Sequence, residues 1–82
     1  MAYYVYILHS NNFDKYYIGQ TNNLNERLKS HNSGSEIYTK PYIPWTLIWS
    51  APKDIRAEAM ALEKKLKNLS KLRLHQFIDK YS

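Results

Sequence analysis

The stretch YYIGQTNNLNERLKSHNSG, residues 16–34, passes from the pattern of a strand to the pattern of a helix within one short segment. Its first residues are aromatic and β-branched, which favours a strand that ends near Gly19. Leucines four residues apart follow, and Glu26 stands where a capping box would place it, so a helix begins here. The N-cap of this helix is one of three polar residues: Thr21, Asn22 or Asn23. The segment NSGS then ends the helix.

Two basic side chains of this helix are expected to share one patch of its surface. Arg27 and His31 are four residues apart, and side chains at that spacing project in nearly the same direction. They lie beside a buried stripe formed by Leu24 and Leu28. A guanidinium can hold two phosphate oxygens, and an imidazole can move a proton near neutral pH.

Upstream of this stretch, the pattern predicts the first half of a β-hairpin. YYVYIL, Tyr3–Leu8, is rich in aromatic and β-branched residues, and KYYIGQ, Lys15–Gln20, resumes the pattern after a loop. If Leu8 lies opposite Lys15, antiparallel pairing places Tyr6 opposite Tyr17 on the same sheet face. The two phenol groups are therefore expected to be neighbours.

Downstream, the chain predicts one more strand and two helices. WTLIWS, residues 45–50, alternates like a strand, with both tryptophans and Leu47 expected on one face. Apolar residues at helical spacing follow Asp54, a plausible N-cap: Ile55, Ala59, Leu62, Leu66 and Leu69. Ser70 is expected to cap a last helix, whose inward side chains are Leu74, Phe77, Ile78 and Tyr81.

These elements define an α/β fold in the order ββαβαα, with a small three-stranded, mostly antiparallel sheet flanked by helices. At 82 residues the chain has room for a single domain, 1–82, with one core. Cysteine is absent, and no apolar run approaches the roughly 20 residues of a membrane span. We therefore expect a cytoplasmic protein without membrane contact.

The charge is strongly basic and unevenly distributed. Twelve Lys and Arg residues against seven Asp and Glu give a net charge of +5, and eight of the twelve lie in residues 51–82. Such an excess is consistent either with solubility alone or with a polyanionic partner, of which nucleic acid is the commonest. The basic side chains that flank the predicted helix after Asp54 are the candidate nucleic-acid contacts: Arg56, Lys64, Lys65, Lys67, Lys71 and Arg73.

The chain resembles the GIY-YIG nuclease domain, and the resemblance extends from Tyr3 to Ile78. It rests on YVY at residues 4–6, YIG at residues 17–19, NLNERLKSHNSG at residues 23–34, and a glutamate within the amphipathic helix. The first triplet lacks the glycine of the family motif but keeps its tyrosine. The likeness is greatest to small stand-alone bacterial members, which are similar to the catalytic domain of structure-selective repair endonucleases.

The resemblance implies the site residues. It places catalytic groups at Tyr6, Tyr17, Arg27, His31 and Glu63, with Gly19 as a structural residue of the site. Tyr6 would be the general base, a role that an unperturbed phenol pKa of about 10 does not itself suggest. Glu63 would bind one Mg²⁺ or Mn²⁺ ion. The other acidic residues are scattered along the chain, so a clustered two-metal site is not expected.

The sequence therefore predicts a metal-dependent endonuclease that hydrolyses DNA in preference to RNA, selects structure rather than sequence, and acts in repair or recombination. No reader of base sequence is present, so a protein partner could supply further specificity. The alternative is a catalytically inactive nucleic-acid-binding module on the same scaffold. An interaction protein unrelated to nucleic acid would leave the five matched positions unexplained.

Glu63 also has a purely structural interpretation, in which it forms an ion pair with Lys67 one helical turn later.

Overall fold

The computed structural model describes residues 2–81 and has the predicted order of elements. A short 3-10 helix, η1, is inserted in the loop before the third strand. The elements are β1 (Tyr3–Ser10), β2 (Lys15–Thr21), α1 (Leu24–Asn32), η1 (Lys40–Tyr42), β3 (Thr46–Lys53), α2 (Arg56–Lys67) and α3 (Lys71–Tyr81).

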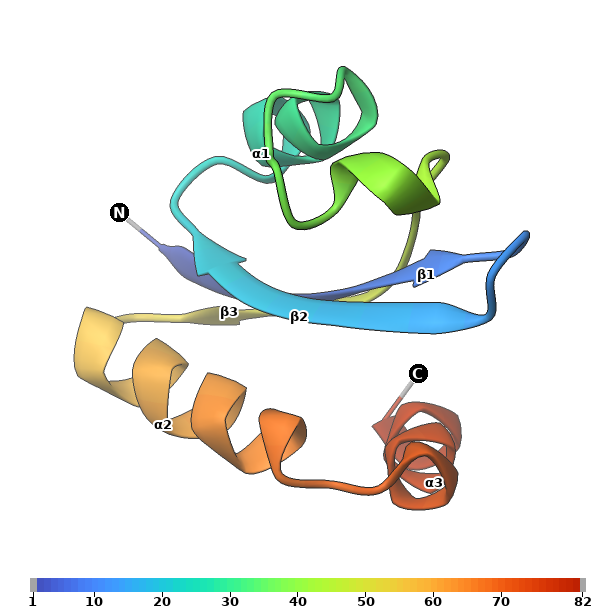
Figure 1. Ribbon diagram of the computed structural model, residues 1–82. Coiled ribbons are helices and arrows are strands. Elements are labelled where there is room, and N and C mark those ends of the chain that lie inside the picture. Colours follow the sequence, from blue (N-terminus) through green and yellow to red (C-terminus); the bar gives the residue numbers. More distant parts are fainter. Residues whose placement is uncertain (1, 82) are drawn as a thin grey trace.

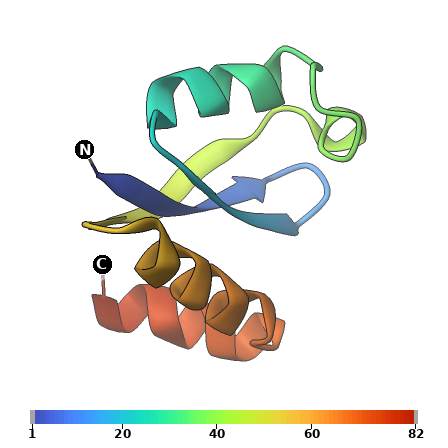
Figure 2. The ribbon, with the colours of Figure 1, turned by 90° about the vertical axis from the view of Figure 1, so that its left-hand side faces the viewer.

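The sheet is antiparallel throughout and has β1 in its centre, in the order β2-β1-β3. Helix α1 and the η1 loop cover one face, and α2 and α3 cover the other (Figure 1). The view turned by 90° shows the same three layers, with the sheet between the two groups of helices (Figure 2). The α/β class and the order ββαβαα are thus confirmed.

Alternation along β1 divides the core between the two faces of the sheet. Val5 and Ile7 point toward α2 and α3 and join Ala59, Leu66 and Leu74. Tyr6 and Leu8 point the other way and pack with Trp45 and the leucines of α1. All four of these β1 residues are almost fully buried because a central strand is covered on both faces. Tyr6 is therefore a core residue as well as a candidate site residue.

The hairpin register differs from the predicted one by two residues. β1 continues through His9 and Ser10, so Ser10 pairs with Lys15 and Leu8 pairs with Tyr17. Tyr6 consequently lies opposite Gly19, and the prediction that it faces Tyr17 was wrong. The loop is shorter than expected because Asp14 adopts a left-handed backbone conformation with φ of 49° and reverses the chain tightly. The shift is an even number of residues, so both tyrosines still share a face.

A bulge in β3 also corrects the predicted facing of its residues. Ile7 pairs with Trp49 but Leu8 pairs with Leu47, which leaves Ile48 as the extra residue. Leu47 therefore packs on the α1 side with Trp45, whereas Trp49 packs on the α2 and α3 side. The prediction that these three side chains share one face was wrong.

The helix boundaries confirm some caps and correct others. Asn23 caps α1, where its side chain accepts a hydrogen bond from the backbone N–H of Glu26 at 3.2 Å. Ser70 accepts a comparable bond from the backbone of α3. Helix α2, by contrast, starts after Ile55, with no side-chain cap from Asp54. Ile55 is correspondingly exposed rather than part of the buried stripe.

The loop between α1 and β3 is held by the side chain of Asn32, the last residue of α1. Its carboxamide oxygen accepts the backbone N–H of Trp45 at 2.6 Å, and its nitrogen donates to the carbonyl of Trp45 at 3.0 Å. The indole N–H of Trp45 donates to the carbonyl of Thr39 at 2.9 Å. These bonds close the η1 loop against the end of α1 and fix the position of Thr39.

Substitution of Asn32 by Ala removes both bonds to Trp45 and leaves a part-buried backbone N–H without a partner. We expect a loss of about 1–3 kcal/mol in the free energy of unfolding, measured by urea denaturation. Asn25→Ala, on the exposed surface of the same helix, is the matched control and should change stability by less than about 0.5 kcal/mol. Equal effects of the two substitutions would contradict this account of the loop.

Candidate active site

The hydroxyl of Tyr6 lies over Gly19, on the edge strand β2. A Cβ atom added to Gly19 would stand 2.6 Å from the Tyr6 hydroxyl oxygen and 2.7 Å from its ring carbon Cζ. Real Cβ atoms essentially never come so close to other heavy atoms. Glycine is therefore required here by the phenol of Tyr6 itself.

A buried chain of hydrogen bonds runs from Tyr6 into the η1 loop. The Tyr6 hydroxyl lies 3.1 Å from Nε2 of His31, and Nδ1 of His31 lies 2.9 Å from the Thr39 hydroxyl. His31 and Thr39 have no exposed surface. Burial and the charge of Arg27 lower the pKa of His31, so the ring is neutral near pH 7 and has one N–H.

The position of Arg27 indicates which way these bonds run. The Arg27 guanidinium interacts with the Tyr6 hydroxyl, and a guanidinium can only donate. With this cation beside its oxygen, the Tyr6 hydroxyl is best placed to donate its own proton to Nε2 of His31. The remaining N–H of His31, on Nδ1, donates to the oxygen of Thr39. This arrangement can move a proton from the phenol toward the imidazole.

A carboxylate from the loop after α1 orients Arg27. One guanidinium nitrogen of Arg27 donates to Oε1 of Glu36 at 2.7 Å, and both side chains are about one-third exposed. Interaction with Tyr6 raises the pKa of Arg27 further, so the guanidinium stays charged. Its remaining donors are available for an anion at the surface of the site.

Burial dominates the electrostatics of Tyr6. Desolvation raises the pKa of the phenol, whereas hydrogen bonding to Arg27 lowers it, and the charges of Tyr17 and Glu63 raise it again. The net shift is upward, so a free phenolate is disfavoured at neutral pH. A base role for Tyr6 therefore requires either a cation nearby or transfer of its own proton to His31.

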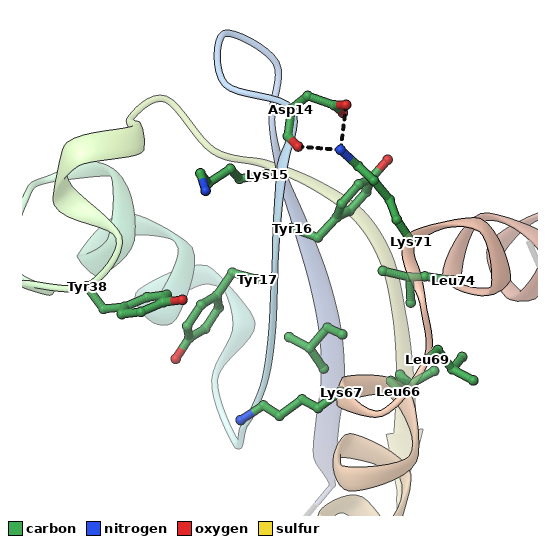
Figure 3. Close-up of a pocket in the computed structure, with 11 residues that line it drawn as sticks. Asp14, Lys15, Tyr16, Tyr17, Tyr38, Leu66, Lys67, Leu69, Lys71 and Leu74 are labelled. Carbon is green, nitrogen blue, oxygen red and sulfur yellow. Dashed lines mark hydrogen bonds and ion pairs between the residues drawn. The ribbon is translucent and has the colours of Figure 1, made fainter.

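Tyr17 lies at the outer side of this group. Its ring centroid is 4.8 Å from that of His31 and 6.3 Å from that of Tyr6. On its other side the ring of Tyr38 follows at 6.0 Å. Tyr17 thus covers one side of the Tyr6–His31 pair and lines an open groove along β2 (Figure 3).

Glu63 approaches the same place from the opposite layer. It belongs to α2, which covers the other face of the sheet, but its charge contributes a small upward effect to the pKa of Tyr6. Its side chain is only 18% exposed, and Oε2 lies 2.7 Å from Nζ of Lys67. The pairing with Lys67 considered from the sequence is therefore present. Glu63 therefore acts on the site through the charge of its carboxylate. The other four predicted catalytic side chains form one connected cluster: Tyr6, Tyr17, Arg27 and His31.

The donor set fits a single hard cation with one protein carboxylate. Glu63 offers a largely buried carboxylate oxygen, and the ammonium of Lys67 beside it shows that this position accommodates positive charge. Within residues 2–81, His, Asp and Glu side chains nowhere gather in a group of three that could hold a metal ion. A magnesium ion there would complete its shell with water and substrate oxygens.

The six basic residues predicted to contact nucleic acid are all exposed on α2 and α3. Lys67 and Lys71 line the groove along β2. Lys67 also pairs with Glu63, and Lys71 pairs with Asp14 at 2.6 Å. Lys64 lines a second hollow that includes Glu63. The other three are exposed elsewhere on the two helices: Arg56, Lys65 and Arg73.

Sequence reasoning missed Glu36 and Thr39. Both lie in the loop after α1 and hold Arg27 and His31 through hydrogen bonds of 2.7 and 2.9 Å. Their segment has no periodic pattern, and their partners are eight or nine residues away in sequence. Only the path of the loop brings these residues under the helix.

Comparisons with known proteins agree with this architecture. Residues 2–76 match the model of the GIY-YIG catalytic domain. A UPF0213 protein of Bacillus velezensis is 33% identical over 79 residues, which cover 95% of this chain and 79% of that protein. A UPF0213 protein of Streptococcus pneumoniae is 34% identical over 76 residues, which cover 92% of this chain and 76% of that protein. The solution NMR structure of a UPF0213 protein from Bacillus halodurans has 32% identity and a TM-score of 0.63, and covers 96% of this chain and 84% of its own.

The fold and the cluster around Tyr6 thus define a domain of the GIY-YIG type. The chain belongs to the GIY-YIG nuclease family, as its sequence had indicated. Within that family it is similar to small bacterial UPF0213 proteins. No helix formed by residues 2–81 is both long and apolar enough to cross a bilayer.

The contact between Tyr6 and Gly19 predicts a specific coupling. Gly19→Ala should lower the free energy of unfolding by about 1–3 kcal/mol, because the new methyl group displaces the phenol. In a Tyr6→Leu background the same change should cost clearly less, which a double-mutant cycle by urea denaturation would measure. An identical cost in both backgrounds would show that the clash lies elsewhere.

The lowered pKa of His31 predicts how stability depends on pH. The unfolded chain, with an ordinary histidine pKa of about 6.5, binds this proton more readily than the folded chain. The stabilisation is therefore complete above pH 6.5 and is lost as the pH falls below it. Between pH 7 and pH 5, the free energy of unfolding, measured by urea denaturation, should fall less steeply with decreasing pH for His31→Gln than for the wild type. His9 and His75 remain in both proteins, so an unchanged slope would refute the assignment.

Proposed function

We propose that this protein is a Mg²⁺-dependent endonuclease that hydrolyses phosphodiester bonds, with DNA as its substrate. The observation that carries the proposal is the connected cluster of Tyr6, His31 and Arg27 at an open sheet edge, with the Glu63 carboxylate near enough to affect Tyr6. It combines a proton acceptor, a cationic clamp and a hard metal ligand. These groups can serve the needs of phosphodiester hydrolysis: activation of water, stabilisation of the charge on the phosphoryl oxygens and help for the leaving oxygen.

The proton pathway follows from the hydrogen bonds. The Tyr6 hydroxyl takes a proton from the attacking water while its own proton passes to Nε2 of His31. This transfer supports a base role without a free phenolate, which the raised pKa of Tyr6 disfavours. The water oxygen forms its bond to phosphorus as the bond to the leaving oxygen breaks. The leaving oxygen takes a proton from solvent, and the proton held by His31 returns to Tyr6 as Tyr6 releases its own to solvent.

Arg27 and Glu63 provide the electrostatic stabilisation. Arg27, oriented by Glu36, would donate to the phosphoryl oxygens on which negative charge grows. Glu63 would hold one Mg²⁺ or Mn²⁺ ion, with the ammonium of Lys67 leaving its carboxylate. The ion supplies charge neutralisation for the phosphate and for the leaving oxygen. Tyr17, at the mouth, would hydrogen-bond the phosphate or the attacking water.

The exposed basic residues of α2 and α3 support binding to a nucleic-acid backbone beside this site. Contacts of this kind give affinity and salt dependence without reading sequence. We therefore infer selection by nucleic-acid structure, as in repair or recombination, with further specificity supplied by a protein partner. A cytoplasmic location would suit this activity.

A binding module without catalysis is the second candidate. Two observations favour it: the upward pKa of Tyr6, and the ion pair that already neutralises Glu63. It predicts DNA binding with no hydrolysis on nicked, branched or single-stranded DNA, or on matched RNA, with either Mg²⁺ or Mn²⁺. The two candidates are therefore separated by one panel of substrates assayed with each metal and with EDTA.

Glu63→Gln keeps the size of the side chain and removes its charge. We expect Mg²⁺-dependent cleavage to fall by about 100-fold or more, since charge stabilisation of the transition state is lost. Affinity for Mn²⁺, measured by titration calorimetry, should fall in parallel, whereas DNA binding in EDTA should stay within about twofold. Glu58→Gln, on the exposed surface of the same helix, is the control. Full cleavage by Glu63→Gln would refute the role of this carboxylate.

A further inference from the structure

The segment Glu36–Thr39 is held at both of its ends by the catalytic cluster. Glu36 binds Arg27 at 2.7 Å, and Thr39 lies 2.9 Å from His31. Between these anchors, Ile37 is 90% exposed and Tyr38 is 75% exposed. Single exposed apolar residues are common on protein surfaces, but here two large ones are adjacent and fixed at the mouth of a site.

Tyr38 is the outermost of a series of rings that leads to the reacting centre. Its centroid is 6.0 Å from that of Tyr17, with 48° between the ring planes. Tyr17 in turn contacts His31 and Tyr6. In Figure 3 the rings of Tyr38 and Tyr17 stand side by side at the open groove along β2. A group resting on Tyr38 would therefore lie one ring away from the group that Tyr17 contacts.

Lysines flank these rings within the same groove. Lys15 comes from β2 and Lys67 from α2, and their ammonium groups lie on opposite sides of the two tyrosines (Figure 3). Lys71 lines the far end, where Asp14 holds its ammonium at 2.6 Å. The groove thus offers the ammonium groups of Lys15 and Lys67 on either side of an aromatic face. This combination fits a phosphate backbone whose bases stack on protein rings.

We propose that Ile37 and Tyr38 form a stacking platform for an unpaired nucleobase next to the scissile phosphate. The base lies on the ring of Tyr38, and Ile37 blocks the neighbouring base step in the manner of an apolar wedge. The flanking phosphates contact Lys15 and Lys67. The platform rests on the proposed nuclease function and specifies it, because a base inside a continuous duplex does not present its face.

The anchoring explains why this platform would be coupled to the site. A base that presses on Tyr38 acts on a segment whose two ends hold Arg27 and His31. The rings and the hydrogen bonds therefore keep the base, the guanidinium and the imidazole in a fixed relation. A protein partner would not need positive charge on both sides of the rings, so a nucleic acid is the occupant that the charges favour.

The test is a binding titration in EDTA, where no hydrolysis occurs. The probe is a DNA duplex with a short single-stranded flap that carries 2-aminopurine at its first unpaired position. For wild type we expect 2-aminopurine fluorescence to be quenched by stacking. The double variant Ile37→Ser/Tyr38→Ser should lose the quenching and about 5- to 150-fold in affinity, which corresponds to the loss of one stacked base. Affinity for the unbroken duplex should change by no more than about twofold.

Two further variants separate the role of the ring from general effects. Tyr38→Phe keeps the aromatic face and should retain both quenching and affinity. Leu72→Ser, which removes an exposed leucine from α3, should behave as wild type. Urea denaturation of each variant checks that folding is intact.

Three results would overturn the platform. They are retained quenching and affinity in the double variant, a loss for Tyr38→Phe equal to that of the double variant, and a wild-type dimer in sedimentation that the double variant converts to a monomer. The last would assign these residues to self-association. Because the assay needs no cleavage, stacking by a protein that never cuts DNA would support the platform and refute the proposed endonuclease. Cleavage of DNA by the wild type, together with unaltered flap binding by the double variant, would support the endonuclease and refute the platform.

Discussion

The structure depends on the burial of a neutral imidazole between a phenol and a hydroxyl. His31 has no exposed surface, and buried polar groups must find partners. Its two nitrogens therefore bind Tyr6 of the central strand and Thr39 of the η1 loop. One side chain of α1 thereby joins the sheet, the helix and the loop. The candidate chemistry is built from the contacts that hold this half of the molecule together.

Local pattern was sufficient for the elements, and for much of their packing. Helical spacing predicted α2 and α3, and the polar run before Leu24 predicted the start of α1, where Asn23 is the cap. The pattern could not reveal the bulge at Ile48 or the tight reversal at Asp14, because both are choices of backbone conformation. These two features set which side chains face each other across the sheet. Predicted pairs were therefore less accurate than predicted strands.

The residues of the candidate site likewise fall into those that could be predicted from the sequence and those that could not. Arg27 and His31 could be predicted to share a patch because helix geometry requires it. Their partners Glu36 and Thr39 could not, since an irregular loop delivers them. The resemblance to the GIY-YIG domain named Tyr6, Tyr17 and Glu63. The reason for Gly19 appeared only in three dimensions, where the phenol of Tyr6 occupies the space of a side chain.

The order of the sheet explains why the site forms at β2. Tyr6 projects from the face covered by α1, whereas Glu63 belongs to a helix on the other face. Side chains on opposite faces can touch one substrate only around an edge, and β2 is an edge strand next to β1. Glycine opposite Tyr6 lets the phenol reach across β2 toward that edge. An exposed edge strand can pair with a strand of another chain, and charged side chains along it oppose such pairing. The charged and aromatic side chains beside β2 have this effect, and they also suit contact with a phosphate backbone.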